Sequence, residues 1–110
     1  MDEYKEWGHE KCAKMILDRL GDNPIYVTFD LDCLDATVAP GTANLEPAFR
    51  GFNIDEARKL IQCLKGKNVI GGDVACLMPT KDSPNQITSM VASAVMFEII
   101  CLISVNLNNK

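Results

Sequence analysis

Apolar side chains near the start of the chain follow two different spacings. Within residues 9–23, four apolar residues recur at i, i+3, i+4 and i+7, which predicts a helix with one apolar face: Ala13, Ile16, Leu17 and Leu20. Gly21 supplies a stop signal for this helix. Residues 24–29, PIYVTF, are rich in β-branched and aromatic side chains. They predict a buried strand that ends where a group of aspartates begins.

The alternation of helix and strand resumes after a long loop. Residues 30–51 are rich in Pro, Gly, Ala and Thr, as is typical of irregular structure. Asn53 is followed three residues later by Glu56, which matches the capping-box pattern. Since apolar residues then recur at helical spacing, we expect a helix over residues 53–64.

The last part of the chain adds a strand and a long helix. Residues 67–74, KNVIGGDV, predict the second strand, with Asp73 at its carboxyl end. Ser83, Pro84 and Gln86 resemble another capped helix start, with Pro at the first helical position, for a helix over residues 83–104. The order is therefore α-β-α-β-α, which implies a parallel βαβ unit. Two parallel strands make a poor sheet alone, so we expect residues 1–110 to be part of a larger α/β domain.

Composition and charge exclude several classes of partner. Apolar residues make up 47% of the 110 residues and charged residues 24%, as in ordinary globular proteins. The net charge of −4 argues against nucleic acid and against an anionic membrane surface. Residues 91–105 form the most apolar stretch, but it has 15 residues and contains Glu98, so we expect no membrane span. Five cysteines without a CxxC spacing, and a polar start unlike a signal peptide, favour reduced thiols and a cytoplasmic location.

Three aspartates directly follow the first predicted strand. Asp30 and Asp32 are two residues apart, so both carboxylates point to one side if the extended conformation continues. Such a pair suits a hard divalent cation such as Mn²⁺ or Mg²⁺. The alternative is that one aspartate caps the following turn and the others are solvated. An EF-hand loop is excluded, because Leu34 and Asp35 stand where that loop needs an oxygen ligand and a glycine.

Longer segments of the sequence resemble one enzyme family. The segment YVTFDLDCLDATVAPGT, residues 26–42, is similar to the signature of the ureohydrolase (arginase/agmatinase) family, and of agmatinases most closely. The resemblance continues through FNIDEARKLIQCLKGKNVIGGDV and PTKDSPNQITSMVASAVMFEII, over nearly all of residues 24–103. A haloacid-dehalogenase-like phosphatase, with Asp30 as nucleophile and Asp32 as acid/base, is the weaker alternative, since Leu34 departs from its motif.

The resemblance implies a fold, a reaction and a metal centre. The chain would be the C-terminal portion of a three-layer α/β/α parallel-sheet ureohydrolase domain, a homo-oligomer when full-length. Its reaction would be hydrolysis of a C–N bond in a small guanidino or amidino substrate, usually releasing urea, by a hydroxide shared by two Mn²⁺ ions. Asp30 would match the carboxylate that bridges both ions, and Asp32 a ligand of one. Asp35 would brace the loop by local hydrogen bonds.

The sequence departs from the family where the substrate would bind. Ala36 replaces a proline, and residues 43–45 replace a Gly-Thr-Pro segment, which makes Asn44 a candidate substrate-binding residue. Cys76 stands where the family has a glutamate that holds the guanidinium by charge-assisted hydrogen bonds. Cys76 is thus the second substrate-binding candidate, although a thiolate beside metal ions would ligate one of them. Glu46 is a possible substitute acid.

The sequence also lacks the histidines of the family's metal centre. His9 is the single histidine, and we expect it to be a solvated residue at the start of a helix. The two-metal site would therefore need ligands from a longer parent chain. The alternative function is a non-catalytic or truncated ureohydrolase remnant that acts as a binding or structural subunit.

Overall fold

The structure is a computed structural model that describes residues 1–42 and 51–109. Within these residues, four helices, two strands and two short 3₁₀ turns follow one another. They are α1 (Asp2–Trp7), α2 (His9–Leu20), β1 (Ile25–Asp30), a turn at Leu31–Cys33, α3 (Ile54–Gln62), β2 (Val69–Ala75), a turn at Pro79–Lys81, and α4 (Ile87–Asn108). The predicted α-β-α-β-α order is confirmed, with α1 as an addition.

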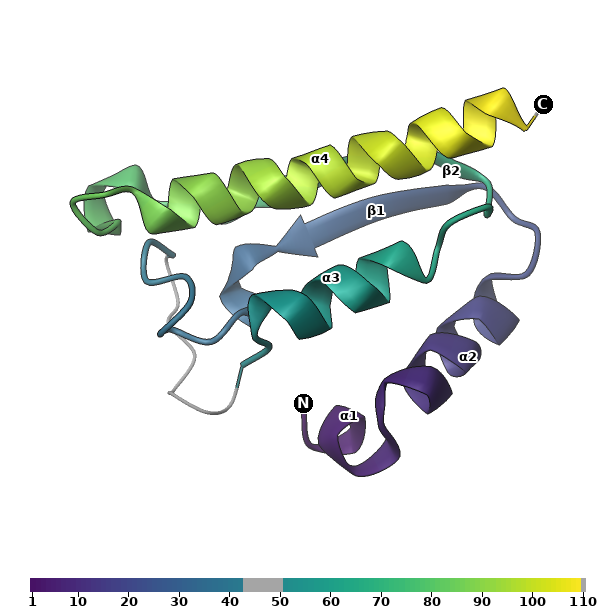
Figure 1. The fold of residues 1–110 in the computed structure, drawn as a ribbon, viewed down its shortest axis with the longest axis horizontal. Helices are drawn as coiled ribbons and strands as arrows, with labels where there is room; N and C mark the ends of the chain where they lie inside the picture. Colours follow the sequence, from purple (N-terminus) through teal and green to yellow (C-terminus); the bar gives the residue numbers. More distant parts are fainter. Residues whose placement is uncertain (43–50, 110) are drawn as a thin grey trace.

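β1 and β2 form a parallel pair, as the sequence predicts. Thr28 lies opposite Asp73 and Asp30 lies opposite Ala75, so both strands end at the same edge of the sheet. The chain passes from one strand to the other through α3. Figure 1 shows α4 running along the full length of the molecule, with β1 between α4 and α3 in this view.

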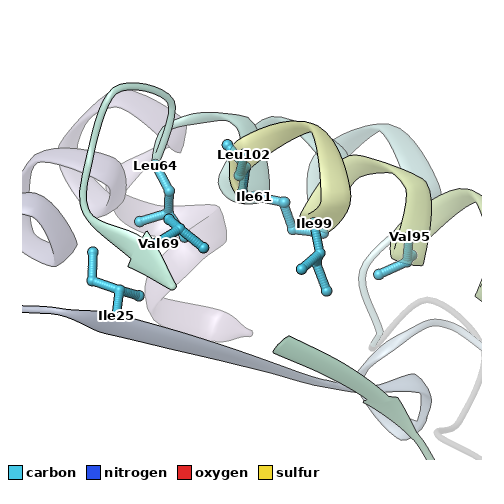
Figure 2. Close-up of a cluster of buried hydrophobic side chains, with 7 residues drawn as sticks. All are labelled: Ile25, Ile61, Leu64, Val69, Val95, Ile99 and Leu102. Carbon is cyan, nitrogen blue, oxygen red and sulfur yellow. The ribbon is translucent and has the colours of Figure 1, made fainter. Parts of the chain in front are cut away.

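Helices α2, α3 and α4 pack on one face of this sheet. Figure 2 shows the buried cluster between the strands, α4 and the α3 segment: Ile25, Ile61, Leu64, Val69, Val95, Ile99 and Leu102. On α2, Leu17 and Leu20 pack against the same cluster. On the opposite face, Tyr26 remains 59% exposed. The second helical layer of the expected three-layer arrangement is thus not among the residues that the structure describes.

The start of α3 follows the sequence pattern closely. Asn53 Oδ1 accepts a hydrogen bond from the backbone N–H of Glu56 at 2.8 Å, and Glu56 Oε1 accepts one from the N–H of Asn53 at 3.0 Å. This reciprocal pair satisfies two N–H groups that the helix itself leaves unpaired. The predicted capping box is therefore confirmed.

The start of α4 differs from the prediction. The helix begins at Ile87, and Gln86 before it has φ 56°, so Pro84 is not the first helical residue. Ser83 does contribute to the cap, since its Oγ accepts a bond from the N–H of Ile87 at 3.3 Å. The shorter bonds go to the side chain of Asp82, whose oxygens accept from the N–H of Thr88 at 3.0 Å and of Ser89 at 2.9 Å. A carboxylate there is favoured because it meets unpaired N–H groups and the positive end of the helix dipole.

α4 begins and ends four residues later than the predicted helix over residues 83–104. It has 22 residues and is, by length and composition alone, apolar enough to cross a membrane, the one such helix in residues 1–42 and 51–109. The expectation of no membrane span therefore stays a prediction. One side of α4 is buried against the sheet, where Asn106 donates hydrogen bonds to Asn68 and to the carbonyl of Val69. The other side leaves large apolar residues exposed: Met90, Phe97, Ile100 and Leu107.

The capping role of Asp82 predicts an acid-sensitive stability. Burial raises the pKa of Asp82, but hydrogen bonds from Thr88 and Ser89 outweigh it and hold the pKa well below its ordinary value. Because the folded pKa is depressed, this stabilisation is present above the unfolded pKa of about 4 and is lost as pH falls below it. We expect Asp82→Asn to lower the thermal midpoint at neutral pH and to flatten its fall in acid. The exposed control Asp18→Asn should not flatten it, and equal acid slopes for Asp82→Asn and wild type would contradict the assignment.

α4 packs closely against β2 because Gly72, in β2, has no side chain. A Cβ at this position would lie 2.6 Å from Ile99 Cγ2 and 2.7 Å from the carbonyl oxygen of Val27. We expect Gly72→Ala to lower the free energy of unfolding by about 1–3 kcal/mol in urea denaturation, because the packed helix must shift. Gly71→Ala is the matched control, since its Cβ meets only the exposed Tyr26 ring, at 3.1 Å. Equal losses for the two variants would show that this contact does not limit packing.

Candidate metal centre

Three potential ligands come together at the carboxyl ends of the two strands. A carboxylate oxygen of Asp30, a carboxylate oxygen of Asp32 and Sγ of Cys76 all lie within 4.8 Å of one another. Asp30 is the last residue of β1, Asp32 lies in the 3₁₀ turn that follows, and Cys76 is the first residue after β2. Open α/β sheets place their ligand sites at this edge. The group therefore joins two of the predicted metal ligands with one predicted substrate residue.

The two aspartates meet by a different route from the one expected. The extended conformation does not continue past Asp30, because Leu31–Cys33 turn into a 3₁₀ helix. Asp30 Oδ1 accepts a hydrogen bond from the N–H of Asp32 at 2.8 Å and so caps this turn. The turn-capping role is thus present. It is compatible with metal binding, because a carboxylate has two oxygens and several lone pairs.

Cys76 enters the site through the register of the sheet. Ala75 is paired with Asp30, so the next residue along β2 lies beside the end of β1. The backbone of Cys76 has φ 74°, in the left-handed region that side chains other than glycine rarely adopt. From the sequence, Cys76 was a substrate-binding candidate whose thiolate would ligate a neighbouring metal ion, and the structure places its sulfur beside both metal-ligand candidates. The cue in the sequence is its position directly after the strand.

Asp73 was expected at the same edge and lies elsewhere. It is within β2, opposite Thr28, two residues before the strand ends. Its carboxylate accepts hydrogen bonds from Thr28 Oγ1 at 2.6 Å and from the Tyr26 hydroxyl at 2.9 Å. These two bonds, that of Thr28 first, hold the pKa of Asp73 below its ordinary value, and the bond to Asp73 raises the pKa of Tyr26. Asp73 therefore links the two strands and is not part of the ligand group.

The thiol of Cys76 is neutral beside its acidic neighbours. Its hydrogen bond with Asp30 is the largest influence that raises its pKa, followed by burial and by the charges of Asp30 and Asp32. Two carboxylates so close disfavour a third negative charge. A cation placed between the three groups would instead favour the thiolate form of Cys76, because it attracts all three negative charges.

Asp35 braces the loop, as the resemblance predicts. Its Oδ1 accepts hydrogen bonds from the N–H of Thr37 at 3.0 Å and from the Thr37 hydroxyl at 2.7 Å. Its Oδ2 accepts a longer bond, 3.4 Å, from the N–H of Gly51. Gly51 is needed there, because a Cβ would lie 2.3 Å from the backbone nitrogen of Asp35. The side chain of Asp35 thus shapes the loop and remains buried.

The other predicted site residues do not join this group. Asn44 and Glu46 lie outside the described residues. His9 begins α2, as expected, and its side chain is half-buried. Its Nδ1 is shielded from solvent and has no hydrogen-bond partner among the described residues. The three-membered group contains no histidine.

The residues present fit a divalent metal ion. Two carboxylate oxygens and one sulfur are all common ligands, and donors bound to one ion lie about 3–4 Å apart at the usual bond lengths. The observed separations, within 4.8 Å, approach this value. Three ligands leave at least one coordination position for further protein groups, water or substrate.

Comparisons with known proteins agree with this geometry. Residues 1–102 match the family model described as Arginase family. An "Agmatinase" of Enterobacter sp. (strain 638) is 41% identical over 98 residues, which is 89% of this chain and 31% of the relative. Proclavaminate amidino hydrolase from Streptomyces clavuligerus superimposes with a TM-score of 0.88 at 30% identity, over 96% of this chain and 35% of that one. A hypothetical agmatinase from Burkholderia thailandensis gives 0.85 at 33% identity, over 97% and 33%.

Each comparison covers most of this chain but only about a third of the matching protein. The chain spans about a third of the length of the curated relatives it matches. Both strands and the aspartates at their edge lie within residues 1–102, which match the family model. The phosphatase alternative receives no support from these matches. The chain belongs to the Arginase family, with the α/β ureohydrolase fold.

Proposed function

We propose that this chain supplies part of the metal centre of a hydrolase that cleaves a C–N bond in a guanidino or amidino compound. The observation that carries the proposal is the meeting of Asp30 and Asp32 at the carboxyl ends of a parallel strand pair in an Arginase-family chain. Because the chain spans about a third of its relatives, the activity belongs to a protein that contains the remaining ligands as well.

The two aspartates would hold the cation, and the resemblance implies two Mn²⁺ ions in the complete site. When bound, such an ion lowers the pKa of water and so supplies a nucleophile near neutral pH. Asp30 presents its carboxylate from the end of β1, already oriented by the N–H of Asp32. Asp35, through Thr37 and Gly51, holds the loop that follows in a fixed shape. These contacts orient the ligands before a cation binds.

The substrate class is drawn from the names of the relatives. They include agmatinases, a proclavaminate amidino hydrolase and arginases. These names refer to compounds that carry an amidino or guanidino group. We propose a small substrate of this kind, no nucleic-acid or membrane partner, a homo-oligomer and a cytoplasmic location. The exposed apolar side of α4 would then be covered by other parts of the protein. Neutral Cys76 is a poor partner for a cationic guanidinium, which favours a substrate held by other groups.

A second candidate is a non-catalytic metal-binding or structural subunit. Two observations favour it: the sequence has a single histidine, and Cys76 occupies the position of the expected glutamate. His9 is not in the ligand group. This protein would bind a cation at Asp30 and Asp32 without hydrolysing amidino compounds.

Metal-ligand substitutions separate the two candidates. In the protein that contains this chain and the rest of the family's length, we expect urea release from agmatine or another guanidino compound in the presence of Mn²⁺. Asp30→Asn and Asp32→Asn should each lower this rate by about 100-fold or more, because each removes a negatively charged ligand. Asp22→Asn, an exposed change between α2 and β1, is the control. Metal binding without any urea release would favour the non-catalytic subunit.

Cys76 provides a test of substrate recognition. If its thiol leaves a guanidinium without its anionic partner, Cys76→Glu should improve kcat/KM for agmatine by about 10- to 100-fold, mainly through KM. The reason is the charge-assisted hydrogen bond that the carboxylate adds. Cys76→Gln is the matched control, since it has the same length without the charge. An equal effect of both variants, in protein that retains its metal, would contradict this role.

A further inference from the structure

We propose that Cys76 is itself a metal ligand and makes this site select thiophilic ions, Zn²⁺ and Co²⁺, more strongly over Mn²⁺ than two carboxylates would. The inference deepens the proposed function, because it rests on a cation being held by Asp30 and Asp32. It adds a third ligand to the site and predicts which cation the site prefers. Sulfur is the donor that changes the preference.

The backbone conformation places the Cys76 sulfur beside the two carboxylates. Cysteine has one side-chain torsion, so its sulfur can reach only a few positions once the backbone is fixed. Register brings Cys76 next to Asp30, and φ 74° turns the chain immediately after β2. The resulting separations are all within 4.8 Å, close to the about 3–4 Å between donor atoms that bind one ion.

The ligand group combines independently positioned elements. Asp30 belongs to a strand, Asp32 to the 3₁₀ turn after it, and Cys76 to the segment that follows the other strand. In the part of the chain that the structure describes, this is the one group of three such side chains with converging donor atoms.

The donor set determines the ion. Mn²⁺ prefers oxygen ligands, whereas Zn²⁺ and Co²⁺ accept thiolate together with carboxylate. Binding forms a metal–sulfur bond, and the thiol proton passes to solvent, so no oxidant or reductant takes part. Since Cys76 is exposed, a cation can reach the sulfur from solution.

The test is a titration of the 110-residue chain with Co²⁺ alone, because cobalt–thiolate bonds absorb in the near ultraviolet. We expect a charge-transfer band that saturates at one Co²⁺ per chain and is displaced by Zn²⁺. Cys76→Ser should abolish the band, whereas Cys101→Ser, which removes a half-buried thiol of α4, should leave it. Circular dichroism checks that both variants keep the fold.

A competition experiment measures selectivity directly. The ratio of the Mn²⁺ and Zn²⁺ dissociation constants should fall about tenfold or more in Cys76→Ser, since a direct ligand matters at least as much as an outer-shell contact. Persistence of the Co²⁺ band in Cys76→Ser, its absence in the wild type, or an unchanged ratio would each overturn the proposal.

These outcomes are distinct from failure of the proposed hydrolase. Mn²⁺-dependent urea release by the longer protein, without a cobalt–thiolate band, would overturn the role of Cys76 and leave the hydrolase standing. A band lost in Cys76→Ser, in a protein that releases no urea with Mn²⁺, Co²⁺ or Zn²⁺, would support the role of Cys76 and reject the hydrolase.

Discussion

The parallel register of β1 and β2 is the constraint on which the rest of this structure depends. Asp30 is opposite Ala75, and this pairing alone determines that Cys76 follows at the same edge. A slip of one residue would turn every side chain of β2 to the opposite face. It would take Asp73 away from Tyr26 and Thr28, whose hydroxyl groups join the strands through its carboxylate. The contacts between the strands and the ligand group therefore both depend on this register.

Five of the chain's aspartates fall into two groups according to what surrounds their carboxylates. Asp35, Asp73 and Asp82 accept hydrogen bonds from backbone N–H or hydroxyl groups, and each fixes a loop, a strand pair or a helix start. Asp30 and Asp32 lie close together with a neutral thiol beside them. Like charges at this distance repel, and a cation between them would turn repulsion into attraction. The same residue type thus stabilises the fold in three places and forms a candidate ligand pair in one.

Sequence patterns predicted local structure well where the determining contacts are local. Both strands and the capping box of Asn53 and Glu56 depend on residues a few positions apart, and they are confirmed. The start of α4 was wrong, because its cap is Asp82, which reaches past a turn to the N–H groups of residues six and seven positions later. The turn after Asp30 had been predicted only as the alternative to a continued strand, in which an aspartate caps the turn that follows it.

The candidate site could be predicted only in part for a similar reason. The pair Asp30 and Asp32 is visible as a motif, and the resemblance to ureohydrolases rests on it. Cys76 lies 44 residues after Asp32, and only strand register brings them together. Asp73 was expected at the end of its strand, but β2 continues for two more residues. At its actual position Asp73 lies opposite Thr28 of β1. Tertiary pairing, which no local spacing encodes, accounts for each of these differences.

The most direct test of the metal centre is anomalous diffraction from crystals of the chain soaked in Zn²⁺, recorded on both sides of the zinc absorption edge. The account predicts an anomalous peak between the carboxylates of Asp30 and Asp32 and the sulfur of Cys76. It also predicts that the peak disappears from crystals of Asp30→Asn. A zinc peak at other residues, with none at the carboxyl ends of β1 and β2, would contradict the account.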